Sequence, residues 1–468
     1  MATAVHYLRG GVRPAEKTML KSVAAIPPSL AGATAAWDGL VRATLRHAAD
    51  TPEWLGKACA LAPQSPALLS AKGLIFMLLG RRELVCEATT LSAEARVALS
   101  EMPSRHDGLM VCALESWVAG RPSRSAKIFD VVQREFPGDA FAAKMAQAIR
   151  FLYGAAAGMR RSAELAVASF GDDHPHAGYI HGCFAFACEE VGDLALAERV
   201  GMRALELAPD DAWALHAVAH VHEMRGHPEK GRAWLAPRQS AFAHCSTFRH
   251  HVWWHYALFE LELGAYDSVL ALYDTEIRRE STDDYRDIAN AVSLLARLEA
   301  DGVDVGERWE ELACLAEQRM YDGCIPFADL HYLLALLAAG RDGAAEQLIA
   351  RMASGADGSE FGAVAAGCGA VAGGGLAAMR RGKHDEAFQG LIAARHALTK
   401  LGGSHAQRDV FERLTIAAAL RAGRCDQARS LVQERAQRRG AYDSFSMKRL
   451  EQCGPATVAA PAASSAAF

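Results

Sequence analysis

The feature that most constrains the fold is a short pattern that recurs along most of the chain. An apolar run is followed by a glycine with a polar neighbour and then by an alanine-rich amphipathic run, as in EEVGDLALAERV at Gly192 and LLAAGRDGAAEQL at Gly340. Glycine ends a helix readily because it adopts positive φ, and small alanines let two helices approach closely. Each copy therefore predicts a helix hairpin. The other turn glycines are Gly80, Gly120, Gly226, Gly264, Gly382 and Gly423.

The spacing of these glycines predicts a repeat protein. Gly192 and Gly226 are 34 residues apart, whereas Gly340 and Gly382 are 42 apart. A period of about 34 residues is typical of tetratricopeptide repeats. Because strand signals are nearly absent, we expect an all-α, tetratricopeptide-like solenoid: helix hairpins in a right-handed superhelix with irregular repeats. The irregular lengths favour a closed or strongly curved superhelix over an open, regular peptide groove.

The repeats predict one long structural unit with short ends. We expect an N-terminal segment at 1–35, a helical-repeat solenoid at 36–445 and a flexible C-terminal tail at 446–468. The tail is predicted because GPATVAAPAASSAAF has no amphipathic period. A chain of 468 residues is long for one globular core but ordinary for a solenoid, which grows by stacking.

Composition excludes several partners. The net charge of −5 gives no general attraction for nucleic acid or anionic lipid. The N-terminus lacks an apolar signal region, and no apolar run reaches about 18 residues, so we expect neither secretion nor a membrane span. The 11 cysteines, odd in number and without a Cys-x-x-Cys pair, indicate reduced thiols. We therefore expect a cytoplasmic protein without nucleic-acid or membrane partners; a homo-oligomer stays open.

Two pairs of histidines are the clearest candidate site. His216 and His220 are four residues apart, as are His251 and His255, so each pair lies on one face of a helix. The second pair follows the first by 35 residues, about one repeat, and Glu223 is in phase with the first pair. We expect these five residues to act in acid–base chemistry, or the four histidines to bind a divalent transition metal such as zinc, iron or copper. The alternative is a set of packed, hydrogen-bonded helix histidines.

Two later motifs carry further polar residues. Asp329 and His331 lie in PFADLHYLLALLAAGR, although a first-turn helix carboxylate is the slightly better explanation of Asp329. In LGGSHAQRDVFERL, Ser404 and Gln407 have the spacing of a capping box, and Arg408 could clamp a carboxylate or phosphate. We expect both motifs to reach the histidines from later repeats. The predicted ligand-binding residues are Asp329, His331, Ser404, His405, Gln407, Arg408 and Asp409.

The same motifs, taken in order, resemble a known family. DAWALHAVAHVHEMRG, HHVWWHYALFELELGAYDSVLALYD, PFADLHYLLALLAAG and LGGSHAQRDVFERL are similar to the tetratricopeptide repeat protein 38 family, as is SRHDGLMVCALESWVAG around His106. The resemblance covers roughly residues 35–440. It implies an α-helical repeat fold and brings no settled reaction. The chain departs from the family pattern at GAVAAGCGAVAGGG, where the many glycines would loosen a helix.

Two functions follow from these patterns. In the first, a helical-repeat protein encloses a small polar, anionic ligand in a pocket lined by His, Glu and Arg, as a metal-assisted or acid–base enzyme. In the second, the protein is an interaction scaffold of the tetratricopeptide-repeat type. A scaffold is expected to line its groove with Asn, Lys and Arg at regular spacing, which the sequence lacks. The phased polar residues therefore favour the pocket.

Overall fold

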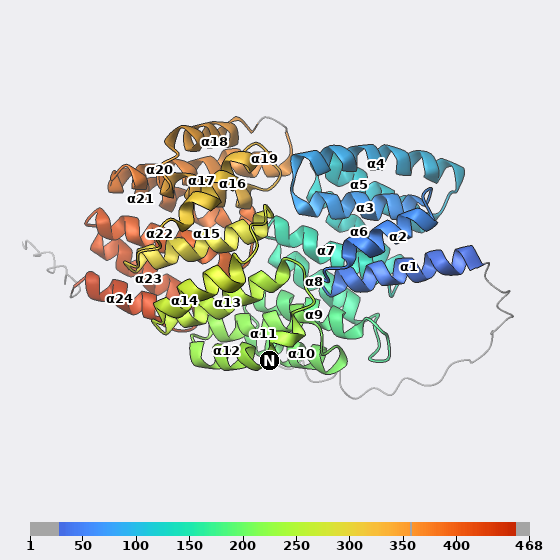
Figure 1. Cartoon of the computed structure of the whole chain (residues 1–468), viewed down its shortest axis with the longest axis horizontal. Helices are drawn as coiled ribbons and strands as arrows, with labels where there is room; N and C mark the ends of the chain where they lie inside the picture. Colours follow the sequence, from blue (N-terminus) through green and yellow to red (C-terminus); the bar gives the residue numbers. More distant parts are fainter. Residues whose placement is uncertain (1–27, 356–357, 455–468) are drawn as a thin grey trace, which may run out of the picture.

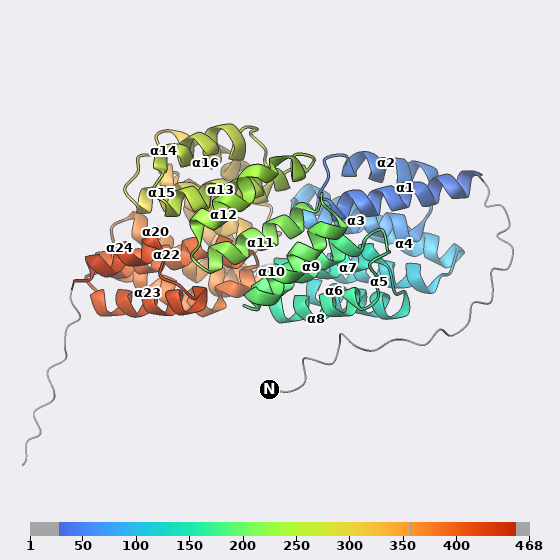
Figure 2. The same cartoon turned by 90° about the horizontal axis from the view of Figure 1, so that it is seen from below.

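The computed structural model describes residues 28–355 and 358–454, and every named element in these ranges is a helix or helical turn. Figure 1 shows α1 to α6 at one end of the molecule and α22 to α24 at the other, with α9 to α12 between them. Figure 2, seen from below, gives the same order. Consecutive helices pack against one another along the chain. The predicted all-α, tetratricopeptide-like solenoid is confirmed.

The helices follow one another along the chain and are named below in three groups of eight. The first group comprises α1 (Pro28–Leu45), α2 (Thr51–Leu61), α3 (Pro66–Leu79), α4 (Arg82–Glu101), α5 (Arg105–Val118), α6 (Pro122–Glu135), α7 (Ala140–Leu152) and α8 (Ala156–Val167). The second comprises α9 (Ala177–Glu190), α10 (Leu194–Leu207), α11 (Ala212–Met224), α12 (Pro228–Leu235), α13 (Phe248–Glu262), α14 (Tyr266–Leu272), α15 (Tyr285–Ala300) and α16 (Arg308–Arg319). The third comprises α17 (Pro326–Ala338), α18 (Asp342–Ser354), α19 (Glu360–Val364), α20 (Ala370–Arg380), α21 (His384–Ala394), α22 (His405–Arg421), α23 (Cys425–Arg439) and α24 (Ser444–Gln452). The 3₁₀ turns are η1 (Ala236–Ala241) and η4 (Arg395–Leu401), and the π turns are η2 (Tyr273–Ile277) and η3 (Ala365–Gly369).

The turn glycines behave as the sequence predicts. All eight have positive φ, from 62° at Gly80 to 84° at Gly192. At Gly192 the backbone N–H donates to the carbonyl of Glu189 at 2.8 Å, which ends α9 before α10 begins. The hairpins therefore arise from local backbone preference, and their packing follows from the apolar faces they bring together.

The superhelix closes on itself between repeats that are far apart in sequence. The α1–α2 loop bonds to the loop before α13, because the N–H of Ser246 donates to the carbonyl of His47 at 2.9 Å. Further along, the N–H of Glu360 donates to the carbonyl of Gly120 at 2.9 Å. The N–H of His405 donates to Oε1 of Glu190 at 3.0 Å. Successive turns of the superhelix thus pack directly on one another, which agrees with the predicted closed form.

The solenoid extends beyond both predicted boundaries. Helix α1 begins at Pro28, inside the segment predicted as 1–35, and α24 occupies Ser444–Gln452, inside the tail predicted as 446–468. Helix α24 is stabilised because Asp443 caps it through the N–H of Ser446 at 2.9 Å and because Phe445 is buried at 1% exposure. The remainder of the predicted N-terminal segment and tail lies outside the described residues.

One segment contradicts the expectation that no apolar run could span a membrane. Glu360–Arg380, which joins α19, η3 and α20, has 21 residues and a mean hydropathy of 1.5. By length and composition alone, it is long and apolar enough to cross a membrane. It packs against α17 and α18, and 56% of its apolar window is buried within the protein. The glycine-rich stretch lies in this segment. Its π turn at Ala365–Gly369 agrees with the predicted loosening of the helix.

Candidate functional site

The two histidine pairs come from neighbouring helices. Helix α11 begins at the N-cap Asp211, whose carboxylate accepts from the N–H of Trp213 at 3.0 Å. Helix α13 packs against α11, one repeat later. The four-residue spacing puts His216 and His220 on the face of α11 that meets His251 and His255 of α13. We call these four residues the histidine cluster.

The ring nitrogens of the histidine cluster converge. Nε2 of His216 lies 2.8 Å from Nε2 of His220 and 3.0 Å from Nε2 of His251. Nε2 of His251 lies 3.2 Å from Nε2 of His255. One nitrogen from each ring can be chosen so that all four lie within 4.8 Å of one another, a grouping able to hold a metal ion. His216, His220 and His255 are 0–1% exposed, and His251 is partly buried.

Polar groups from three helices lie behind three of the rings, at Nδ1. Nδ1 of His255 lies 3.1 Å from Oε2 of Glu223, and Nδ1 of His220 lies 3.4 Å from Oε2 of Glu189. Nδ1 of His251 lies 3.1 Å from Oδ1 of Asn290 on α15. An ionised carboxylate and an amide oxygen can only accept, so the contacts of His255 and His251 place the ring hydrogen on Nδ1. Glu223 and Asn290 therefore orient two rings with Nε2 toward the centre, and the Glu189 carboxylate lies behind the third.

The electrostatic surroundings keep most of the cluster neutral. Burial, together with neighbouring histidines, lowers the pKa of His216 and His251 well below the usual value and lowers that of His255 to about 4. Burial opposes a charge on His220 as well, but the Glu189 carboxylate raises the pKa of that ring. Neutral imidazole is the form that binds metal ions.

Several residues that contribute to this site were not predicted from the sequence. Glu189 and Asn290 lie behind the rings; Asn290 follows His255 by 35 residues, the spacing of the histidine pairs, whereas Glu189 lies outside that spacing. His47 stacks on Trp213 with ring centroids 5.1 Å apart, and its Nε2 lies 2.9 Å from Nζ of Lys144. Glu189 had a readable signal, since it lies in a pair of carboxylates that ends the otherwise apolar run HGCFAFACEE.

The Ser404 motif reaches the edge of the cluster, but its side chains are engaged within the protein. Ser404 and Gln407 form the predicted capping box, and Nε2 of Gln407 donates to Asn290 Oδ1 at 3.3 Å. Arg408 donates to the carbonyl of Gly403, and its Nη2 lies 3.5 Å from Oε2 of Glu190. His405 also contacts Glu190. The guanidinium of Arg408, predicted to anchor an anionic ligand, is engaged with Gly403 and Glu190 in this structure.

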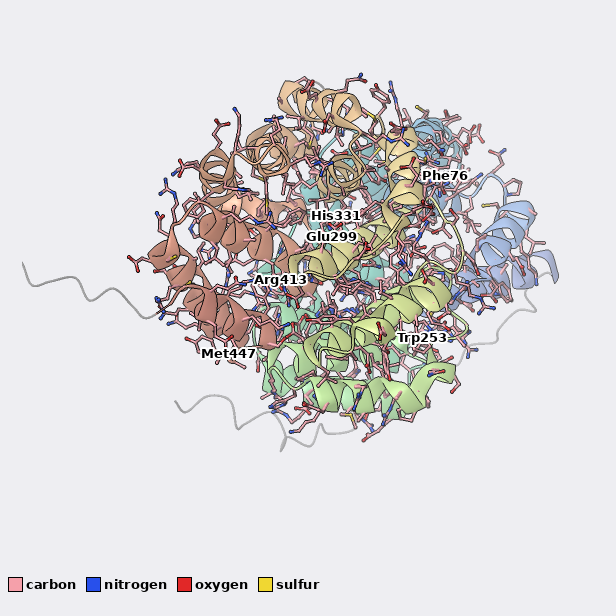
Figure 3. All side chains as sticks on the ribbon, turned by 60° about the vertical axis from the view of Figure 1, so that its left-hand side comes forward. Phe76, Trp253, Glu299, His331, Arg413 and Met447 are labelled. Atoms are coloured by element: carbon pink, nitrogen blue, oxygen red, sulfur yellow. The ribbon has the colours of Figure 1, made fainter. Side chains whose placement is uncertain are left out.

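Asp329, His331 and Asp409 take other partners. Asp329 pairs with Nη2 of Arg351 at 2.5 Å, so the first-turn carboxylate interpretation is favoured. His331 donates from Nδ1 to the carbonyl of Phe327 at 2.8 Å and lies in the middle of Figure 3. Asp409 belongs to a buried ion network with Arg435. His216, His220, Glu223, His251 and His255 therefore come together as expected, whereas Asp329, His331 and Asp409 contact other groups.

Burial of the histidine cluster argues against a substrate pocket. The pocket that includes a residue of the site, Glu223, has a volume of about 190 Å³ and is also lined by Arg439 and Glu262. Glu223 lines this pocket, whereas His216, His220 and His255 are almost completely inaccessible to solvent. The hypothesis of an enzyme that binds a small anionic ligand at these histidines is therefore not supported.

His106, in another of the family-like motifs, has a separate structural role that predicts a pH effect. Hydrogen bonds to Asp107 and Asp139 raise the pKa of His106 from 6.5 to about 9. Because the folded-state pKa is the higher one, this stabilisation is fully present below pH 6.5 and is lost as pH rises toward 9. We expect the melting temperature of the wild type to fall more than that of His106→Gln across this interval. Parallel profiles in thermal denaturation would contradict the assignment.

Solved structures that resemble this chain have low sequence identity and low TM-scores. No family model matches the chain. Human IFIT1 with PPP-AAAA is 13% identical, with 89% of this chain and 94% of that chain covered and a TM-score of 0.40. Cut9, in the APC/C hetero-tetramer Cut9–Hcn1, is 13% identical, covering 90% and 74% of the respective chains with a TM-score of 0.39. Yeast Tom70 is 12% identical, covering 90% and 94%, with a TM-score of 0.32. The helix hairpins and turn glycines of the chain itself define its tetratricopeptide-like fold.

Proposed function

We propose that this protein is an interaction scaffold of the tetratricopeptide type, which binds a segment of a partner protein carrying both apolar and acidic side chains. The observation that carries the proposal is a groove of about 560 Å³ bounded by α15, α16, α17, α20, α22 and α24. We call it the C-terminal groove. It is open to the surface, unlike the histidine cluster.

The walls of the C-terminal groove are mainly apolar. Leu334, Leu414 and Leu420 are only partly buried although they pack against the hydrophobic core, so each leaves apolar surface facing the groove. Burial of apolar area contributes about 25 cal/mol per Å². Apolar side chains of a docked segment would supply the main part of the binding free energy on this surface.

The charges around the groove favour an acidic partner. Arg380 and Arg421 are exposed at the ends of α20 and α22, and neither forms an ion pair with any residue in the described ranges. Burial and nearby arginines, including Arg421, lower the pKa of Arg449 on the same groove. The acidic residue of the lining, Glu299, accepts from Nε1 of Trp309 at 2.9 Å. A carboxylate placed between the arginines would relieve their repulsion.

The groove supports a scaffold better than the histidine cluster supports an enzyme. The regular Asn, Lys and Arg spacing expected of a scaffold is absent, but the arginines gather at helix ends instead. Basic side chains at helix ends also interact favourably with the helix dipole, which holds them near the groove. The small-molecule partner predicted from the sequence is thereby replaced by a protein segment.

Binding of defined peptides tests the proposal. We expect a short fluorescein-labelled peptide of alternating Leu and Glu to bind the full chain, measured by fluorescence polarisation. Peptides of alternating Leu and Lys, or Ser and Glu, lack one of the two features and should bind more weakly. The double substitution R380E/R421E should weaken binding of the Leu/Glu peptide by about tenfold or more, because like charges then face each other.

A matched control uses an arginine on another face. Arg199→Glu alters an exposed arginine on α10 and should leave the affinity unchanged. The R380E/R421E variant should in turn gain affinity for the Leu/Lys peptide. If the Leu/Glu peptide fails to bind, or binds the double variant and the wild type equally, the groove is not an acidic-segment site.

Two finer assignments are also proposed. We infer membership of the tetratricopeptide repeat protein 38 family from the ordered motifs around His216, His251 and Ser404. We propose a cytoplasmic location, supported by cysteines that form no disulfide in the described structure. Recovery of the same motifs in order in aligned homologues, and imaging of a tagged full-length chain, test these assignments.

A further inference from the structure

We infer that the histidine cluster is a structural metal centre, in which His216, His220, His251 and His255 bind one divalent transition-metal ion of the zinc class through Nε2. This site is separate from the C-terminal groove and does not depend on the scaffold proposal. The inference rests on the contacts among the rings, on the acceptors behind them and on the burial of the whole group.

The first step is the direction of the lone pairs. Glu223 and Asn290 accept at Nδ1 of His255 and His251, and a carboxylate oxygen of Glu189 lies 3.4 Å from Nδ1 of His220. With its hydrogen on Nδ1, each neutral ring turns a lone pair on Nε2 toward the others. His251 and His255 then face each other with two lone pairs 3.2 Å apart.

With the hydrogens of His251 and His255 on Nδ1, no arrangement of neutral rings satisfies all the central contacts. If His216 carries its hydrogen on Nε2, it can donate to both His220 and His251, at 2.8 and 3.0 Å. The contact between His251 and His255 is still left without a hydrogen. In addition, Nδ1 of His216 is then a buried acceptor, and it has no hydrogen-bond partner in the described structure. A cation at the centre removes the repulsion and gives each lone pair a ligand role.

The second step is the fit of the nitrogens to an ion. Zinc binds imidazole nitrogen at about 2.0–2.1 Å, and a tetrahedron of that size has edges of about 3.3–3.4 Å. The three short Nε2–Nε2 distances, 2.8, 3.0 and 3.2 Å, fall slightly below this edge. Four imidazoles suit zinc, copper, nickel or cobalt and disfavour magnesium and calcium, which prefer oxygen ligands.

The third step is the charge behind the rings. Metal-bound histidines usually donate their second N–H to a carboxylate or carbonyl, which fixes the ring and increases its basicity. Here Glu189 is 0% exposed, and neither of its carboxylate oxygens has a hydrogen-bond partner in the described structure except for the 3.4 Å contact to His220. A buried carboxylate in this state requires positive charge nearby. An ion bound through His220 supplies that charge.

The centre is structural because four protein ligands complete a tetrahedron and leave no position for substrate. Catalytic zinc sites usually keep one position open, whereas structural sites are closed. The ion would join α11 to α13 and, through Glu189 and Asn290, fix the positions of α9 and α15. The metal therefore holds neighbouring repeats at the angle that the closed superhelix requires.

Metal reconstitution tests the inference without any variant. The full chain is stripped with a chelator, dialysed, and titrated with zinc while bound metal is counted by mass spectrometry. We expect about one ion per chain and a higher melting temperature after reconstitution. Cobalt in place of zinc should give the visible absorption bands of a tetrahedral, nitrogen-ligated ion. A stripped wild-type chain that takes up none of zinc, cobalt, nickel or copper overturns the inference.

Substitutions then locate the ion. Changing a second-sphere partner of a metal ligand commonly weakens affinity by about 10–100-fold, so Glu223→Gln should weaken zinc binding by about that factor. His255→Gln removes a ligand and should weaken zinc binding further. His222→Gln is the matched control, since it makes the same exchange on α11 at a residue outside the cluster. Equal zinc affinity in Glu223→Gln, His255→Gln and the control would place the ion elsewhere and overturn the inference, and circular dichroism confirms that each variant is folded.

Discussion

Replacing Arg435 by alanine is expected to lower the free energy of unfolding by about 3–5 kcal/mol, because it leaves buried carboxylates without their counter-charge. The Arg435 side chain is 2% exposed. Its Nε donates to Oδ1 of Asp409 at 2.6 Å, and its Nη1 donates to Oδ1 of Asp443 at 2.8 Å and to Oγ of Ser446 at 3.0 Å. Equilibrium denaturation in urea measures the loss.

The control lies on the same helix. Arg438 also forms an ion pair, with Glu412 at 2.8 Å, but its side chain is 56% exposed. An exposed pair contributes about 1 kcal/mol or less, so Arg438→Ala should have a small effect. Equal losses in the two variants would mean that the ion network around Arg435 does not stabilise the end of the solenoid.

Replacing Gly154 by alanine is expected to lower the free energy of unfolding by about 2–5 kcal/mol. Gly154 has a φ of 67°, and an added Cβ would lie 1.7 Å from the carbonyl oxygen of Thr399. The strain of a left-handed conformation contributes about 1–2 kcal/mol, and displacement of the packed backbone adds about 1–3 kcal/mol. Chemical denaturation of the purified variant measures the sum.

Gly192 separates the two contributions. It also has a positive φ, 84°, but a Cβ added there would meet nothing within 4 Å. Gly192→Ala should therefore show the conformational strain alone, about 1–2 kcal/mol. If Gly154→Ala were no more destabilising than Gly192→Ala, the close approach of α7 to η4 would add nothing to stability.

Local features of the fold could be predicted from the sequence because they depend on neighbouring residues. A glycine such as Gly192 ends a helix whatever the rest of the chain does. The capping box at Ser404 and Gln407 is equally local, and both were correct. Helix α24 was missed because its sequence, SFSMKRLEQ, is mostly polar. Its burial depends on Phe445, whose ring is surrounded by arginines from α22, α23 and α24 that only the folded chain assembles.

In the candidate site, too, the relations set by helix geometry could be predicted, and the long-range contacts could not. The i, i+4 spacing and the repeat period together placed His216 beside His251, since both relations are set by helix geometry. Of the residues behind the rings, Asn290 continues the 35-residue period from His255, but its amide gives no sign in the sequence that it faces a histidine, and Glu189 lies outside the period. Asn290 reaches His251 from α15, 39 residues away, and Glu190 meets Arg408 from 218 residues away. Those contacts depend on the pitch of the superhelix, which the sequence does not state in any local pattern.

Closure between distant repeats has a consequence for how the chain can change length. An open solenoid tolerates the loss or gain of a repeat, since each unit contacts only its neighbours. Here the N–H of Ser246 bonds to the carbonyl of His47, and the N–H of Glu360 bonds to that of Gly120. Insertion or deletion of one hairpin between such partners would move every later residue out of register with its counterpart. The number of repeats is therefore fixed by geometry, as the number of strands is fixed in a closed barrel.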